Sequence, residues 1–199
     1  FSNKLSFTIT SIGFDNDIVY RNRAKINDDI YVSGNLGDSY MGLLSLKNKI
    51  KLNKSLKKYF INQYYLPNIQ IKLVDQIKKF ANTSIDISDG LLADLDKMIN
   101  SQKLSYKLDL KKIPISSKLK RIIDLKRLSK IKYISNGDDY QILFTASKNK
   151  RRIVEKISSD YSIKLTQIGS IEKFYKKSSI IDDNKRPINH KNKGYFHNF

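Results

Sequence analysis

The chain is organised around the stretch Ser84-Ile85-Asp86-Ile87-Ser88-Asp89-Gly90-Leu91-Leu92. Alternate side chains of a strand share a face, so the two isoleucines are expected to point into a core while Asp86 and Ser88 point to the other side. Asp89 stands where the strand ends, and the apolar residues that follow recur at helical spacing as far as Ile99. The stretch therefore predicts a strand that turns directly into a helix.

This strand-to-helix turn is a candidate ligand site. Two carboxylates and a hydroxyl come together at the carboxyl end of a strand, where open α/β folds usually bind ligands. Carboxylate oxygens suit Mg²⁺, and the amino end of a helix suits phosphate. The alternative is that Asp89 only caps the helix, although a cap would not account for Asp86. A calcium loop is disfavoured because Gly90 and Leu91 occupy its fifth and sixth positions, and a nucleophilic Ser88 because no G-x-S-x-G turn surrounds it.

The composition limits the class of protein. The chain has 199 residues, 40% of them hydrophobic, which suffices for one good domain or slightly more. The absence of Cys removes disulfides and thiolate metal sites and fits a reducing compartment, so we expect a cytoplasmic protein. No apolar run approaches the ~18 residues that a membrane span needs, and no membrane partner is expected.

The net charge of +19 is the main argument for a different function, which is binding to nucleic acid. The basic residues are mostly Lys, however, and they are spread along the chain without a dense block. No stacking motif, Arg cluster or helix-turn-helix pattern accompanies them. We therefore expect a solvated basic surface and no nucleic-acid partner. A basic nucleic-acid-binding module stays as the alternative, and a steep salt dependence of DNA or RNA retention would favour it.

Strands and helices alternate along the chain without long parallel crossovers, which predicts an α+β fold of mixed α/β layers. Besides the strand that ends at the turn, strands are expected at 4–14, 17–20, 29–33, 104–110, 141–145, 163–168 and 178–182. Helices are expected to end near residue 47, to cover 53–64, 69–80 and 149–160, and to follow Pro114. Asp38 or Ser39 is the expected cap of the first helix. Because a strand pattern is already present near residue 4, we expect the chain to be a piece of a longer protein.

Four motifs follow one another along the chain. They are Asp29–Gly34 with Leu36–Ser39, then Ile85–Leu91, then Gly137–Thr145, and finally Lys193-Gly194-Tyr195 with His197. In this order they resemble the motifs of the thiamine-monophosphate kinase family. That family belongs to a superfamily that also holds aminoimidazole ribonucleotide synthetase and selenophosphate synthetase. The resemblance covers nearly the whole chain and rests on the combination of the four motifs.

The resemblance implies ATP-dependent transfer of a phosphoryl group onto thiamine monophosphate, which makes thiamine diphosphate. The alternative within the same superfamily is an enzyme that acts on a different small phosphorylated substrate. Calorimetry of thiamine monophosphate binding, set against the substrates of the relatives, would decide between the two.

The resemblance also implies the carboxyl-terminal α-β-α domain of the aminoimidazole ribonucleotide synthetase-like fold over 23–199. Residues 1–22 would be the last strands of a truncated amino-terminal ATP-binding domain. The acceptor is already an anionic phosphate, so such a reaction needs no general base. It needs Mg²⁺ and the in-line positioning of two polyanions.

The match to the family motifs also assigns roles to residues around the nucleotide. Asp86 and Asp89 would be ligands of Mg²⁺, and Ser88 would contact ATP. Arg21 would pair with the ATP phosphates, which a guanidinium can bind in bidentate fashion. The competing interpretation of Arg21 is a solvated side chain in a basic connector.

Two further residues would bind the substrate by the same match. Asp138 stands where the family has a substrate-binding Glu, which is one methylene longer, and its alternative role is that of a turn residue. Tyr195 stands where an aromatic ring packs against the cationic thiamine, and its alternative role is packing on the core.

The resemblance also implies parts that the chain lacks. In the family, the amino-terminal domain carries further Mg²⁺ aspartates, much of the nucleotide site and the sheet that forms a homodimer. We therefore expect a homodimer for the full-length protein. We also expect that the 199-residue chain alone is not a competent kinase.

Overall fold

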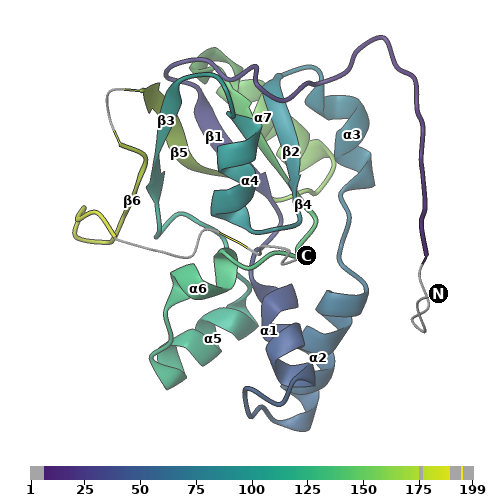
Figure 1. Ribbon diagram of the computed structural model, residues 1–199, viewed down its shortest axis with the longest axis vertical. Coiled ribbons are helices and arrows are strands. Elements are labelled where there is room, and N and C mark those ends of the chain that lie inside the picture. Colours follow the sequence, from purple (N-terminus) through teal and green to yellow (C-terminus); the bar gives the residue numbers. More distant parts are fainter. Residues whose placement is uncertain (1–6, 175–176, 189–193, 195–199) are drawn as a thin grey trace, which may run out of the picture.

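The computed structural model describes residues 7–174, 177–188 and 194, and one sheet forms its centre (Figure 1). Its strands are β1 (Asp29–Ser33), β2 (Ala81–Ile87), β3 (Leu104–Asp109), β4 (Gln141–Ala146), β5 (Leu165–Lys173) and β6 (Ser179–Ile181). They lie in the order β2-β4-β1-β5-β3-β6. Neighbouring strands are antiparallel except β3 and β6, which are parallel. Strands that are neighbours in space are therefore mostly distant in sequence.

Helices cover both faces of the sheet. On one face, α4 (Leu91–Met98) packs its buried leucines and Met98 against side chains of the sheet. On the other face, α3 (Ile71–Ile77) and α7 (Arg151–Asp160) enclose a second core around Phe144 of β4. Because both faces are covered, all five residues of β1 are buried.

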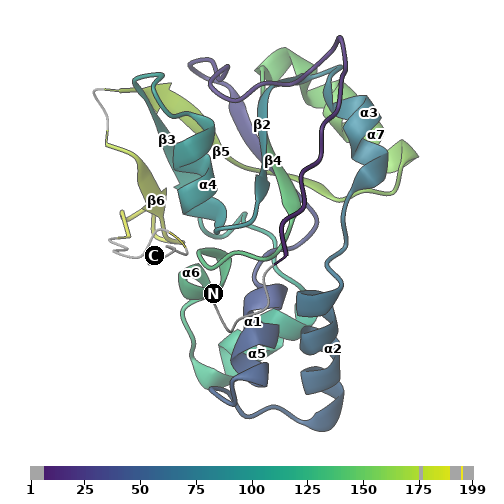
Figure 2. The same cartoon turned by 45° about the vertical axis from the view of Figure 1, so that its right-hand side comes forward.

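Four further helices form a layer at one end of the sheet, as Figure 1 and Figure 2 show. They are α1 (Asp38–Leu46), α2 (Lys54–Tyr65), α5 (Ser117–Lys126) and α6 (Lys130–Ile134), and they share a third hydrophobic core. A short 3₁₀ turn (Lys148–Lys150) precedes α7. Every helix in the described part of the chain is too short or too polar to cross a bilayer.

The expected α+β layers are confirmed, and so are most of the expected elements. Helix α6 was not expected, because its five residues lie next to a stretch whose Asn, Gly and Asp residues predict a turn. The expected cap of the first helix is wrong. Gly37, with φ of 88°, is the N-cap residue of α1, and no side chain caps this helix. The Asp38 carboxylate is buried. It accepts hydrogen bonds from Ser116 Oγ at 2.7 Å and from the Tyr59 hydroxyl at 2.8 Å.

The expected strands at 4–14 and 17–20 are wrong for the described residues 7–20, which form no strand. This segment runs along the outside of the molecule (Figure 1). Its alternating apolar side chains are nearly fully exposed, at 83% for Phe7, 91% for Ile9 and 96% for Phe14. A strand pattern becomes a strand only when a neighbouring backbone supplies hydrogen-bond partners. None of the strands in the described part of the chain pairs with this segment.

Deletion of residues 1–14 is therefore expected to leave the thermal midpoint of unfolding almost unchanged. The exposed segment 7–14 contributes so little burial that a shift within about 2 °C is expected. A longer deletion, through Tyr20, serves as the control. It should lower the midpoint clearly, because Val19 packs against the second core and Thr83 Oγ1 donates to the Tyr20 carbonyl at 2.8 Å. Differential scanning calorimetry measures both, and a large loss from the shorter deletion would contradict the description of this segment.

Candidate functional site

The turn between β2 and α4 is built around one buried carboxylate, that of Asp94. The backbone N–H groups of Ser88, Asp89 and Gly90 all donate to Asp94 Oδ2, at 3.0, 2.9 and 3.1 Å. Gly90 is the N-cap residue of α4, at φ of 118°, and no side chain forms an N-cap hydrogen bond. The interpretation of Asp89 as a simple helix cap is therefore wrong, because Gly90 holds the cap position and Asp94 inside α4 accepts from the backbone that precedes the helix.

The same contacts change the expectation that the helix terminus binds phosphate. Three N–H groups at the turn already donate to Asp94, whose negative charge lies at the positive end of the α4 dipole. A phosphate would have to displace a buried anion to reach these groups. These three groups are therefore not open to an anion, whereas the N–H groups of Leu91, Leu92 and Ala93 in the first turn of α4 take no part in these contacts.

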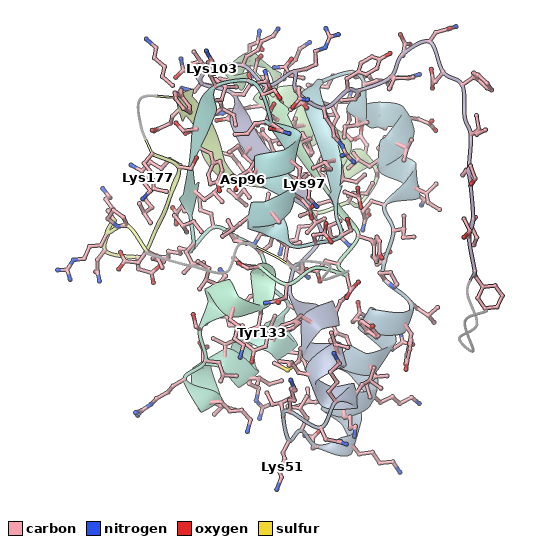
Figure 3. All side chains as sticks on the ribbon, viewed as in Figure 1. Lys51, Asp96, Lys97, Lys103, Tyr133 and Lys177 are labelled. Atoms are coloured by element: carbon pink, nitrogen blue, oxygen red, sulfur yellow. The ribbon has the colours of Figure 1, made fainter. Side chains whose placement is uncertain are left out.

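The Asp89 carboxylate pairs with Lys97, a residue of α4. The Lys97 ammonium donates to Asp89 Oδ2 and, at 3.0 Å, to Asp94 Oδ1. Figure 3 shows Lys97 on α4. The Asp94 side chain is buried, whereas the Asp89 side chain is 25% exposed and that of Lys97 is 45% exposed. Asp89 thus keeps access to solvent, and Lys97 is its partner in this structure.

Asp86 lies on the outward face of β2, as the alternation predicts. Its neighbours Ile85 and Ile87 are buried in the core beneath α4, and Asp86 itself is exposed. It lines a cavity of about 340 Å³ with Ser84, and α3 and residues 15–19 contribute the walls. The carboxylate of Asp86 is therefore available to a ligand on the α3 side of the sheet.

A second segment, Gly137–Tyr140, packs directly on the turn. The Asp138 N–H donates to the Ser88 carbonyl at 2.9 Å, and the Tyr140 N–H donates to the Ile87 carbonyl at 2.8 Å. Asp138 and Tyr140 both adopt left-handed backbone conformations, with φ of 63° and 50°. Such a conformation is uncommon for Tyr, whereas Asp adopts it more readily, and several other non-glycine residues of the described chain share it. These two hydrogen bonds hold the backbone of residues 137–140 alongside the end of β2.

This packing brings three carboxylates near one another. Burial first, and then the charge of Asp89, raise the pKa of the Asp138 carboxyl. Burial raises the pKa of the Tyr140 hydroxyl too, with further contributions from Asp138, Asp86 and Asp89. Asp86 and Asp89 stand at the end of β2 by their place in the chain, and the Asp138 N–H bond to the Ser88 carbonyl brings Asp138 to the same end.

The other two motifs reach the same place. A Cβ atom at Gly194 would lie 2.4 Å from the Ala93 Cβ and 2.8 Å from the Asp89 carbonyl oxygen, so Gly194, the one described residue of the terminal motif, packs against the turn. The glycine loop after β1 is tied on through Gly37, whose N–H donates to Asp139 Oδ2 at 2.8 Å. Burial raises the pKa of the Asp139 carboxyl well above its usual range. Each of the four motifs therefore has at least one described residue at this end of the sheet.

Comparison with known proteins shows what this chain is similar to. No family model matches the chain. The thiamine-monophosphate kinase of Buchnera aphidicola subsp. Acyrthosiphon pisum is 34% identical over 197 residues, which cover 97% of this chain and 60% of the relative. The chain is a homologue of the thiamine-monophosphate kinases. It spans about half to three fifths of the length of the curated relatives it matches.

Solved structures of the family share the fold. The crystal structure of thiamine-monophosphate kinase from Stenotrophomonas maltophilia K279a superposes with a TM-score of 0.73 at 26% identity. The match covers 85% of this chain and 54% of that one. A structure of AaThiL complexed with AMPPCP and TMP gives a TM-score of 0.71 at 29% identity, with 89% and 54% covered. The fold expected from the resemblance is thereby confirmed.

The carboxylates fit Mg²⁺ only in part. Across residues 7–174, 177–188 and 194, no group of three or more His, Cys, Asp or Glu side chains could hold a metal ion. Mg²⁺ is usually bound by one or two carboxylates together with waters and substrate phosphates, and Asp86 and Asp89 can supply that number of ligands. The donor set therefore suits an ion that arrives with a nucleotide, and does not form an all-protein cage.

Arg21 and Tyr195 are not brought to the turn by the described contacts. The Asn22 N–H donates to the Met98 carbonyl at 2.9 Å, so Arg21 lies beside the carboxyl end of α4, whereas the turn precedes its amino end. Tyr195 lies outside the described residues. Ser88 is present at the turn, where its backbone makes the contacts given above.

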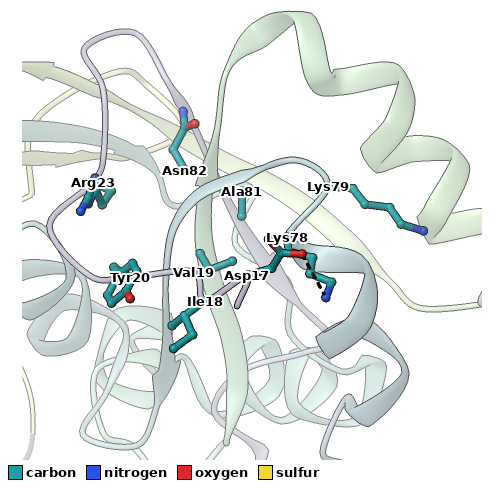
Figure 4. Close-up of a pocket in the computed structure, with 9 residues that line it drawn as sticks. All are labelled: Asp17, Ile18, Val19, Tyr20, Arg23, Lys78, Lys79, Ala81 and Asn82. Atoms are coloured by element: carbon teal, nitrogen blue, oxygen red, sulfur yellow. Dashed lines mark ion pairs between the residues drawn. The ribbon is translucent and has the colours of Figure 1, made fainter. Parts of the chain in front are cut away.

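A second cavity, of about 560 Å³, is less suited to bind a ligand (Figure 4). Three cations line it, and each has a partner within the chain. Lys78 pairs with Asp17 at 3.6 Å, Lys79 donates to Gln76 Oε1 at 2.6 Å, and the Arg23 guanidinium lies 5.5 Å from the centre of the Tyr20 ring. The figure shows Arg23 and Lys79 pointing away from each other. We therefore place the candidate site at the turn after β2.

Sequence reasoning missed three residues of this site, namely Asp94, Lys97 and Asp139. Two of them carried a signal, since Asp94 and Lys97 are three residues apart on a helix and of opposite charge. Asp139 carried none, because adjacent aspartates in a turn segment read as solvent-exposed.

Gly137 offers a direct test of the packing on the turn. A Cβ atom there would lie 1.7 Å from the Ser88 carbonyl oxygen, so Gly137→Ala must displace the backbone of one segment. We expect a loss of about 2 kcal/mol or more in the free energy of unfolding. Gly13→Ala is the control, since nothing lies within 4 Å of its Cβ position. Urea unfolding measures both variants, and equal stability would contradict the contact.

Proposed function

We propose that the chain carries part of the site at which a phosphoryl group passes from ATP to thiamine monophosphate. The observation that supports this most is the packing of Gly137–Tyr140 on the turn after β2, which gathers Asp86, Asp89 and Asp138. A relative of the same fold is complexed with AMPPCP and TMP, a nucleotide analogue and a second ligand. The product of the proposed reaction is thiamine diphosphate.

In this proposal the residues of the chain bind and orient, and none acts as a base. Asp86 and Asp89 are the ligands of Mg²⁺, which when bound neutralises phosphate charge. Ser88 contacts the nucleotide from the turn. Asp94 keeps the turn in one conformation, so that the two acidic side chains present themselves to the same ion. Positioning of two polyanions is the main requirement of such a transfer.

The substrate-binding roles of Asp138 and Tyr195 are also proposals. Asp138 is supported by the hydrogen bond from its N–H to the Ser88 carbonyl, which puts it at the turn beside Asp89. Tyr195 is supported by the family motif and by Gly194, the residue before it, which packs against the turn. Arg21 as a partner of the ATP phosphates rests on the family motif alone.

Calorimetry of thiamine monophosphate binding tests the substrate class. In the presence of Mg²⁺ and AMPPCP, we expect thiamine monophosphate to bind more tightly than thiamine, which lacks the phosphate. Asp138→Asn should weaken binding of thiamine monophosphate by about threefold to tenfold, as the loss of one charge-assisted hydrogen bond does. Equal binding of both compounds would refute the proposed substrate.

We further propose that residues 1–22 belong to an amino-terminal unit and that the 199 residues alone do not turn over. The exposed apolar side chains of residues 7–14 support the first of these statements, and the chain's span of about half to three fifths of its curated relatives supports the second. The full-length protein would be a cytoplasmic homodimer. Formation of thiamine diphosphate by the chain with ATP and Mg²⁺ is the test, and rapid turnover would refute the claim.

A further inference from the structure

Lys97 is placed by two features of α4. It lies three residues after Asp94, and its ammonium donates to Asp94 Oδ1 at 3.0 Å, the one oxygen of that carboxylate that the backbone N–H groups leave open. Because Asp94 is buried and held by three N–H donors, it anchors the Lys97 ammonium beside the turn. From that position the ammonium also donates to Asp89 Oδ2.

The contact with Asp89 has a different character. The Asp89 side chain is partly exposed. Among the described residues, only Lys97 donates a hydrogen bond to its carboxylate. The Lys97 side chain is 45% exposed, so its ammonium can move away from Asp89 without giving up buried contacts. The ammonium therefore stands where a cation bound to Asp89 would experience its charge at close range, and like charges at such a distance repel.

We propose that Lys97 is a tethered counter-ion that competes with the divalent cation for Asp89 and so sets the metal affinity of the site. The proposal rests on the proposed function, in which Asp89 is a metal ligand. Without a divalent cation, Lys97 holds the Asp89 carboxylate against the turn. When the ion binds, Asp89 changes partner and Lys97 keeps its contact with Asp94.

The test measures binding of Mn²⁺ alone, by electron paramagnetic resonance, to the 199-residue chain. Lys97→Met removes the competing charge and keeps an unbranched side chain that is one atom shorter. We expect it to tighten Mn²⁺ binding roughly fivefold to tenfold at low ionic strength. Lys97→Arg keeps the charge and should bind Mn²⁺ about as the unmodified chain does. Lys120→Met is the matched control, because Lys120 forms an exposed pair with Asp124 at 2.8 Å on α5 and its loss changes the net charge equally.

The outcomes separate this inference from the proposed function. If Asp89→Asn weakens Mn²⁺ binding and Lys97→Met does not tighten it, Asp89 is a ligand and the inference about Lys97 is wrong. If Asp89→Asn leaves binding unchanged, or if the unmodified chain binds no Mn²⁺, the metal role of Asp89 is wrong and the inference fails with it. Equal tightening by Lys97→Met and Lys120→Met would show a general charge effect and would also overturn it.

A second measurement does not depend on the spectrum of the ion. Addition of Mg²⁺ should raise the thermal midpoint more in Lys97→Met than in the unmodified chain, since a ligand that binds the folded state more tightly stabilises it more. An equal rise in both would contradict the competition.

Discussion

Replacing Asp89 by Asn is expected to weaken Mg²⁺-dependent binding of AMPPCP at least about tenfold while the chain stays folded. The amide keeps the size of the side chain but loses the negative charge that a hard cation requires. Stability should change little, because the turn is held by the backbone contacts to Asp94 and Lys97 keeps its second partner. Calorimetry with Mg²⁺ present measures the affinity.

Asp124→Asn is the control for this experiment. Asp124 is an exposed carboxylate that also pairs with a lysine of its own helix, at 2.8 Å. It lies on α5, in a different layer from the turn. If both variants bind AMPPCP alike in the presence of Mg²⁺, the assignment of Asp89 as a metal ligand is wrong.

Replacing Asp94 by Ala is expected to have the largest effect on stability. The change removes a buried carboxylate that accepts three backbone hydrogen bonds and pairs with Lys97. Three N–H groups then lose their acceptor at the turn. Losses of this kind predict a fall of about 3 kcal/mol or more in the free energy of unfolding, or ~6 °C or more in the thermal midpoint.

Urea unfolding of Asp94→Ala, Asp94→Asn and Asp124→Ala measures this effect. Asp94→Asn keeps one acceptor oxygen in place and should lose less stability than Asp94→Ala. Asp124→Ala removes an exposed ion pair and should cost about 0.5 kcal/mol or less. A value for Asp94→Ala near that of Asp124→Ala would contradict the account of how the turn is held.

The sequence predicts the strand, the turn and the helix around Asp86 and Asp89 because their periodicities change at one point. Ile85 and Ile87 alternate, and the leucines after Gly90 follow the helical repeat. Both patterns mark the side chains that become buried, and their burial in the core stabilises this strand and this helix. The polar contacts of the turn were less accessible. Asp94 reads as a surface residue of an amphipathic helix, and only the fold shows that its carboxylate is turned back onto the preceding backbone.

The apolar alternation near the start of the chain shows the limit of such patterns. Phe7, Ile9 and Phe14 have the spacing or character of strand residues, yet residues 7–20 form no strand. Periodicity records which side chains could be buried, but pairing requires a neighbour. Local pattern likewise could not show that Asp138 would lie beside Asp89, because strand order joins segments about fifty residues apart. Only the fold shows this relation, through the hydrogen bond from the Asp138 N–H to the Ser88 carbonyl.

The central claim is that the end of β2 carries part of a Mg²⁺-nucleotide site. Its most direct test is the affinity of the unmodified 199-residue chain for AMPPCP, measured by calorimetry with Mg²⁺ and again with EDTA. The account predicts clearly tighter binding with Mg²⁺, since Asp86 and Asp89 repel the bare polyphosphate and attract it only through the ion. Equal affinity in the two conditions, or tighter binding with EDTA, would contradict it.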